Sequence, residues 1–138
     1  MDLGLVAKSL VNLPAFAIYM TASLGMLAIF LAVYTAVTPY REWTLLREGN
    51  LAASISLGGA TIGFSLPLAN IISHTNVLLD VIVWGVVALA VQIVIWAIVS
   101  LLNRGLKERI ARGDAAAGVF LAATSLAGGI VNAACMSY

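Results

Sequence analysis

The sequence carries very little charge. Only 9% of its 138 residues are Asp, Glu, Lys or Arg, whereas 62% are hydrophobic and the mean hydropathy is +1.06. Soluble domains of this size carry roughly a quarter charged residues, because charged side chains keep the folded surface hydrated. This shortage excludes a soluble globular domain and predicts that lipid surrounds most of the chain. The net charge of +1 gives no reason to expect nucleic acid as a partner.

Residues for catalysis and metal binding are also scarce. Cys135 is the single cysteine and has no partner for an internal disulfide. One histidine, His74, together with Asp80 and the distant Cys135, gives no metal-ligand spacing. No nucleophile-and-base pattern or phosphate-binding glycine loop is present. We therefore expect no enzyme activity, no cofactor and no metal.

Long hydrophobic runs, by contrast, account for most of the chain. A helix needs roughly 20 apolar residues to cross a bilayer and, as a helix, satisfies its own backbone polar groups. The third run is rich in β-branched residues, but its unbroken length favours a spanning helix over a strand. The chain is predicted to be an all-α membrane protein, one domain over residues 1–138, with spanning helices at about 13–37, 51–72, 78–102 and 115–136.

Positive residues are concentrated in two of the three connections. By the positive-inside bias these two connections are cytoplasmic, so the N-terminus, the loop around His74 and Tyr138 are predicted outside. Both connections also mix apolar and basic residues, which predicts short helices lying along the lipid headgroups; a docking surface for a cytoplasmic partner is the alternative. The basic residues are Arg41 and Arg47 in the first connection and Arg104, Lys107, Arg109 and Arg112 in the third.

The second half of the sequence resembles the first at a spacing of 64 residues. The segment 47–54, REGNLAAS, aligns with 111–118, ARGDAAAG. Asn50 and Asp114 occupy the same repeat position, and each is a favoured N-cap after a glycine. Because each unit, about 13–72 and about 78–136, contains two helices, both enter from the same side. This predicts two parallel repeats, with both termini outside.

Small residues form stripes on the second helix of each unit. In lipid, small residues let helices approach closely and so favour association. The two stripes at matched positions predict a packing seam, and a second small face in the first unit could serve either within the chain or between chains. The stripes are Ser54, Gly58, Thr61 and Ser65, matched by Gly118, Ala122, Ser125 and Gly129; the second face is Gly59 and Gly63.

A few polar residues at membrane depth or near the outer face are the candidates for a polar path. Asp80 is the acidic residue of the third run, where ionisable groups are functional candidates, although the first turn of a helix also favours an aspartate. His74 could pair with Asp80 or be a solvated loop residue. Gln92 is expected to bond across to a neighbouring helix. The remaining candidates are Asn70 and Asn132.

Several segments resemble one known family. REGNLAAS, LGGATIGFSLPLA, the series His74, Asp80 and Trp84-Gly85, and the run from Gly113 to the end are similar to the YjfL family, classed as domain of unknown function 350. The resemblance extends from about Thr38 onward. It implies a bacterial inner-membrane protein of four helices with an internal duplication, and it supplies no activity.

Two functions fit these features. A membrane scaffold or accessory subunit, associating with itself and with another envelope protein, needs only short loops and small-residue faces. A small channel or transporter, formed by an oligomer, would need Asp80, Gln92 and Asn132 to meet in one hydrated cavity. The sequence favours the first slightly.

Overall fold

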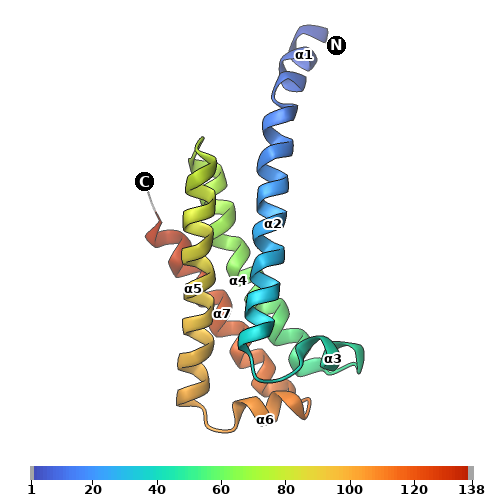
Figure 1. Ribbon diagram of the computed structural model, residues 1–138, viewed down its shortest axis with the longest axis vertical. Coiled ribbons are helices and arrows are strands. Elements are labelled where there is room, and N and C mark those ends of the chain that lie inside the picture. Colours follow the sequence, from blue (N-terminus) through green and yellow to red (C-terminus); the bar gives the residue numbers. More distant parts are fainter. Residues whose placement is uncertain (1, 137–138) are drawn as a thin grey trace.

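The computed structural model describes residues 2–136, and every regular element in that range is an α-helix (Figure 1). Four of these helices are long and apolar enough to cross a membrane. Tyr138, predicted on the outer side, lies outside the described residues. The helices are α1 (Leu3–Val11), α2 (Leu13–Val37), α3 (Glu42–Arg47), α4 (Leu51–His74), α5 (Leu78–Leu102), α6 (Leu106–Ala111) and α7 (Ala115–Cys135).

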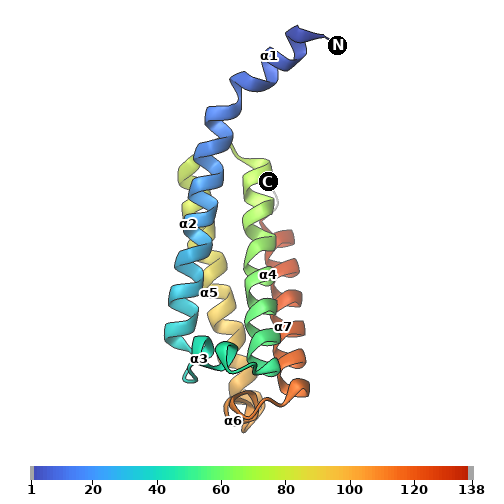
Figure 2. The same ribbon diagram turned by 90° about the vertical axis from the view of Figure 1, so that its right-hand side faces the viewer.

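The observed helices follow the sequence predictions closely. α4 runs two residues beyond the predicted 51–72, and α7 ends one residue short of 136. Both basic connections contain a short helix, as expected, and α3 and α6 lie at the same end of the bundle (Figure 2). α1 was not predicted as a separate helix; it extends beyond the other end, and none of its residues is buried (Figure 2).

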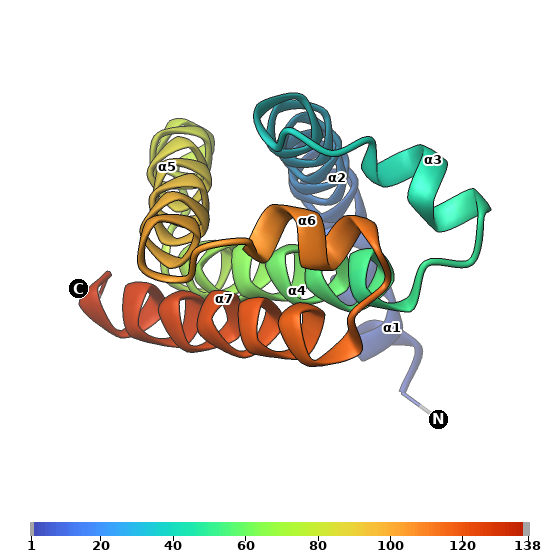
Figure 3. The same ribbon diagram turned by 90° about the horizontal axis from the view of Figure 1, so that it is seen from below.

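The four long helices form two layers. α4 and α7 lie side by side and run in the same direction, while α2 and α5 cover the other side of α4 (Figures 2 and 3). α4 is the most buried spanning helix because it contacts α7, α5, α2 and α3. α2 joins the core at its C-terminal half, where the Phe30 ring stacks on Phe64 with 4.5 Å between centroids.

The turns that lead into α4 and α7 have the same local geometry. Gly49 and Gly113 adopt φ angles of 77° and 84°, a left-handed conformation that glycine adopts without strain. Asn50 then caps α4 by accepting from the Ala53 amide at 2.9 Å, and Asp114 caps α7 by accepting from Ala116 at 3.1 Å. The predicted N-caps are therefore confirmed. Both bounds of α3 lie 64 residues before those of α6, and α4 begins 64 residues before α7.

The α4–α7 seam depends on glycines. A β-carbon added to Gly59 would collide with Ala122, and one added to Gly63 would collide with the Ser125 backbone. Gly129 and Gly118 are equally close to the α4 backbone. Such close backbone approach is the packing that small residues permit between membrane helices.

The seam differs from the predicted pairing of two matched stripes. On α7 the predicted stripe, Gly118, Ala122, Ser125 and Gly129, is buried against α4. On α4 the contacts come from the second small face, Gly59 and Gly63. Ser54 and Gly58 are exposed, and Thr61 and Ser65 are half-buried. The matched stripes do not meet, because α7 packs onto a different face of α4.

Candidate functional site

The two ionisable residues near the end of the bundle opposite α3 and α6 do not form a pair. The His74 ring nitrogen Nδ1 lies 2.8 Å from the Asn70 carbonyl of its own helix. The Asp80 carboxylate accepts a hydrogen bond from the Thr75 hydroxyl at 2.8 Å. Of the two alternatives for His74, the pair with Asp80 is therefore not formed; the His74 side chain is exposed. Asp80 instead ties the loop between α4 and α5 to the first turn of α5.

Two of the predicted polar candidates join helices. Asn70 donates from Nδ2 to the Ala133 carbonyl of α7 at 3.0 Å, and buried Gln92 donates from Nε2 to the Ser125 carbonyl at 3.0 Å. Gln92 thus bonds across to a neighbouring helix, as predicted. Asn132 is half-buried, and its Nδ2 has no hydrogen-bond partner among residues 2–136. Asn70 and Gln92 therefore connect α4 and α5 to α7, and they do not line a common path.

The most unusual ionisable residue is one that the sequence analysis missed. Glu42, the first residue of α3, is 1% exposed. It follows Arg41 in a polar connection, so the sequence pattern is that of a solvated residue. A signal was nevertheless present: the residue 64 positions later, Leu106, begins α6 and is also 1% exposed. Glu42 therefore occupies a core position for which an apolar side chain suffices.

Aromatic and hydroxyl side chains surround Glu42. Thr38, Tyr40 and Tyr34 are all at least nine-tenths buried, and the Tyr40 hydroxyl accepts a hydrogen bond from Trp96 Nε1 at 3.3 Å. No donor within residues 2–136 makes a hydrogen bond of good geometry to either Glu42 oxygen. The Thr38 hydroxyl interacts with the carboxyl only weakly.

This setting shifts the acid–base equilibria of the cluster. Burial raises the pKa of Glu42 to about 8, and the Thr38 hydroxyl opposes that shift only in part. Burial and the negative charge of Glu42 also raise the pKa of Tyr40. Near neutral pH the Glu42 carboxyl therefore keeps its proton, and slightly basic conditions remove it.

A groove at the α3–α6 end of the bundle leads to this cluster. It has a volume of about 370 Å³, and Tyr40 and Lys107 are among the residues that line it. The Lys107 ammonium lies 5.5 Å from the centroid of the Trp96 ring, within the range of a cation–π contact. Chemically, Glu42 with Tyr40 beside it can take up and release one proton close to the bundle surface.

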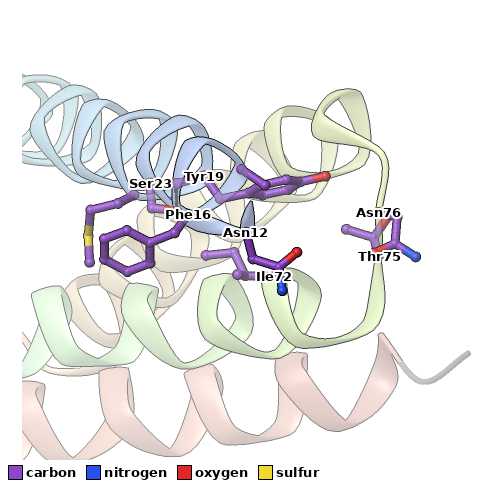
Figure 4. Close-up of a pocket in the computed structure, with 9 residues that line it drawn as sticks. Asn12, Phe16, Tyr19, Ser23, Ile72, Thr75 and Asn76 are labelled. Carbon is purple, nitrogen blue, oxygen red and sulfur yellow. Dashed lines mark hydrogen bonds between the residues drawn. The ribbon is translucent and has the colours of Figure 1, made fainter. Parts of the chain in front are cut away.

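A second groove lies at the opposite end, between α2 and the end of α4 (Figure 4). Phe16 and Tyr19 of α2 face Ile72, with Thr75 and Asn76 at the rim. Its volume is about 480 Å³, and no ionisable candidate residue lines it. Neither groove contains Asp80, Gln92 or Asn132, so the cavity expected of a transporter is absent from both.

Comparison with known proteins identifies a family and two relatives that this chain resembles. The model of the Domain of Unknown Function family DUF350 matches residues 8–136. The chain is 38% identical to the UPF0719 inner membrane protein YjfL of Escherichia coli K12 over 127 residues, which cover 92% of this chain and 96% of the relative. It is 36% identical to the UPF0719 transmembrane protein YshE of Bacillus subtilis over 75 residues, covering 54% of this chain and 56% of that relative.

No solved structure matches the chain. The four apolar helices and the inner-membrane relatives together indicate a multi-pass protein of the inner membrane. With a family model that matches nearly its full length, the chain belongs to the DUF350 family.

Proposed function

We propose that the protein is a non-catalytic, self-associating scaffold or accessory subunit of the bacterial inner membrane. One observation carries this proposal: α4 has a small-residue face that residues 2–136 leave largely uncovered. Ser54 and Gly58 of this face are exposed, and no atom lies within 4 Å of a β-carbon placed on Gly58. In lipid, a small-residue face of this kind favours association with another helix.

Two of the three hydroxyl groups on this face already have hydrogen-bond acceptors within α4. Thr61 donates to the Leu57 carbonyl at 2.7 Å and Ser65 donates to the Thr61 carbonyl at 2.8 Å, both within α4. At Thr61 and Ser65 the face therefore presents no unpaired donor that would require water. This supports a protein contact in preference to a hydrated path along α4.

We infer that the end carrying α3 and α6 lies in the cytoplasm. The support is the charge distribution, since six of the seven Lys and Arg residues are in the connections at that end. Both described chain ends then lie on the outer side. α3 and α6 would present their basic residues to anionic headgroups or to a cytoplasmic partner.

We also infer that the chain is a tandem duplication of one two-helix unit. Support comes from the spacing of 64 residues between both bounds of α3 and α6 and between the first residues of α4 and α7. Further support comes from the turns: the Gly49 amide bonds to Leu46 at 3.1 Å, and the Gly113 amide bonds to Ile110 at 3.0 Å. Units that enter the membrane from the same side are parallel repeats.

Counting subunits in a lipid bilayer tests the scaffold proposal. The protein, carrying one fluorophore per chain, is expected to bleach in more than one step per particle when diluted into lipid nanodiscs or vesicles. Single-step bleaching over the whole accessible range of protein-to-lipid ratios would contradict self-association.

A proton-linked channel or transporter formed by an oligomer is the second candidate, and Glu42 is the observation that favours it. A buried carboxyl with a pKa of about 8 is suited to exchanging a proton. Proton flux into protein-containing liposomes would support this function if Glu42→Gln abolished the flux while Asp80→Asn left it unchanged. No flux above that of empty liposomes would exclude it for the protein alone.

A further inference from the structure

The seam inside the chain joins one face of α4 to one face of α7. From α4, Ala52, Gly59 and Gly63 lie against α7. They meet the α7 stripe of Gly118, Ala122, Ser125 and Gly129. The two helices run in parallel, so the seam continues from the capped ends toward the outer end, where Asn70 bonds to Ala133.

The same two helices each leave a second face uncovered. On α7 the residues 64 positions after Ala52, Gly59 and Gly63 are Ala116, Ala123 and Ala127, and all three are exposed. On α4 the residues 64 positions before the α7 stripe are Ser54, Gly58, Thr61 and Ser65, the exposed and half-buried face described above. Each uncovered face is thus the counterpart of a face that already has its partner within the chain.

We propose that a second copy of this chain repeats the internal seam, with the Ala116–Ala123–Ala127 face of its α7 on the Ser54–Gly58–Thr61–Ser65 face of α4 in the first copy. This inference rests on the proposed self-association and specifies its surface. The internal contact between Gly59 and Ala122 becomes a contact between Ala123 and Gly58, again one glycine against one alanine. The size of the residues therefore permits the same close approach.

The rim of the seam differs between the internal and the intermolecular contact. Within the chain, Asn50 donates from Nδ2 to the Ile110 carbonyl at 2.9 Å and to the Ala111 carbonyl at 3.1 Å. Between copies, Asp114 takes the position of Asn50 and Arg47 takes that of Ala111. Arg47 is exposed and has no ion pair in the part of the chain that the structure describes. The internal bonds end on backbone carbonyls, to which a carboxylate cannot donate. Between copies the Asp114 carboxylate, already bonded to Arg109 at 2.8 Å, is therefore reached by the Arg47 side chain and not by the backbone of the α4 end.

Phe120 marks the main difference between the internal and the intermolecular contact. It is 52% exposed and follows the alanine face, whereas its counterpart Ser56 is fully buried. The α4 face borders an apolar groove of about 380 Å³ lined by Leu31, Leu46 and Ile62. The Phe120 ring of the second copy is placed to fill this groove, which gives the intermolecular contact an apolar anchor that the internal seam lacks.

A contact between two different faces has a consequence for symmetry. The α4 face of one copy meets the α7 face of the next. Each pair therefore still has one free α4 face and one free α7 face, and adding further copies either closes a ring or extends a row. All copies keep the same orientation in the membrane. A twofold dimer, in which the α4 face meets itself, is a different arrangement.

Disulfide cross-linking in native membranes tests the pairing, with Cys135→Ser as the background. The double variant Gly58→Cys/Ala123→Cys is expected to form dimers, trimers and higher species under mild oxidation. Gly58→Cys alone and Ala123→Cys alone are expected to stay uncross-linked, as is the matched control Val83→Cys/Ala123→Cys, which uses an exposed α5 position. Efficient cross-linking of Gly58→Cys alone would overturn the proposal in favour of a twofold contact.

Blocking each face separately provides a second, independent readout. Gly58→Trp and Ala123→Trp change uncovered positions, so each variant should fold with an unchanged circular dichroism spectrum. Alone, each variant is expected to be monomeric in nanodiscs, because every contact needs both faces. An equimolar mixture is expected to form a heterodimer, since each variant retains the face that the other has lost.

The outcomes separate the two proposals. If the wild-type protein is oligomeric but the mixture forms no heterodimer and the double-cysteine variant does not cross-link, another surface makes the contact and this inference fails while self-association stands. If the wild-type protein is a monomer in the bilayer, both fail.

Discussion

Apart from α1, the two halves of the chain have the same order of long and short helices, but these helices have different neighbours. Half of the most apolar stretch of α4 is buried, against 28% of the corresponding stretch of α7. α4 contacts α2, α3, α5, α6 and α7, whereas α7 contacts mainly α4 and α5. A position buried in one half can therefore be exposed in the other. Similarity of sequence between halves predicts similar backbones, but it does not predict which face is covered.

The clearest contrast of this kind is Glu42 against Leu106. Both begin a short helix at the same end of the bundle, and both are almost fully buried. Leu106 fills its site without any polar cost, whereas the Glu42 oxygens lack well-formed hydrogen bonds. Burying a carboxyl lowers the stability of the fold at a position that a leucine can fill. This points to a functional role for Glu42.

The largest expected effect follows from filling the internal seam. Gly63→Val should lower the free energy of unfolding by about 3 kcal/mol, because its β-carbon collides with the Ser125 backbone. The counterpart substitution Ala127→Val, on the exposed face of α7, should cost far less in detergent-solubilised monomers. Thermal unfolding followed by circular dichroism compares the two. Equal losses of stability in the two variants would contradict the claim that this face is covered on α4 and uncovered on α7.

The next largest effect on stability is expected when Glu42 is replaced by leucine, the residue at the equivalent position 106 of the second half. Glu42→Leu should raise the free energy of unfolding by about 2 kcal/mol above pH 8, since it removes a buried carboxylate. The wild-type carboxyl has a pKa of about 8 when folded and an ordinary pKa of 4.5. The folded state thus holds the extra proton between these values, and stability falls as pH rises from about 4.5 to about 8.

Melting temperatures across this pH range measure that dependence. Both Glu42→Leu and Glu42→Gln should remove the fall in stability that the wild-type protein shows. A wild-type melting temperature that rises with pH between 5 and 8, or a slope retained in Glu42→Gln, would contradict a buried, protonated Glu42.

Much of this architecture was predictable from the sequence, and the limits have physical causes. Lengths of apolar runs defined the spanning helices to within two residues, and Asn50 and Asp114 marked the starts of α4 and α7. Periodicity identified the small-residue faces but not their partners, because lipid and protein are equally apolar neighbours for a glycine or an alanine. Glu42 was missed because burial depends on α3 folding back against the bundle.

A smaller effect is expected from the cap of α4. Asn50→Asp keeps the acceptor for the Ala53 amide but removes the donor to Ile110 and Ala111, leaving a carboxylate near two carbonyls. The loss should be about 1–2 kcal/mol. Its counterpart Asp114→Asn keeps a cap and loses only the solvent-screened ion pair with Arg109, so its loss should be clearly smaller. Similar losses in both would show that the two turns are equivalent.

The smallest effect concerns the uncovered face of α4. Gly58→Ala meets no atom within 4 Å, and alanine favours a helix by up to about 1 kcal/mol over glycine. The monomer in detergent should therefore melt at the same temperature or slightly higher. A clearly lower melting temperature would mean that this face is covered within the chain.

The most direct test asks whether both halves enter the membrane from one side. Single cysteines replace exposed Glu48, Arg112 and Asn76 in a Cys135→Ser background, and a membrane-impermeant thiol reagent is added to intact cells and to inverted membrane vesicles. We predict that positions 48 and 112 react only in inverted vesicles and position 76 only in cells. Reaction of positions 48 and 112 from opposite sides would contradict the parallel arrangement of the two halves.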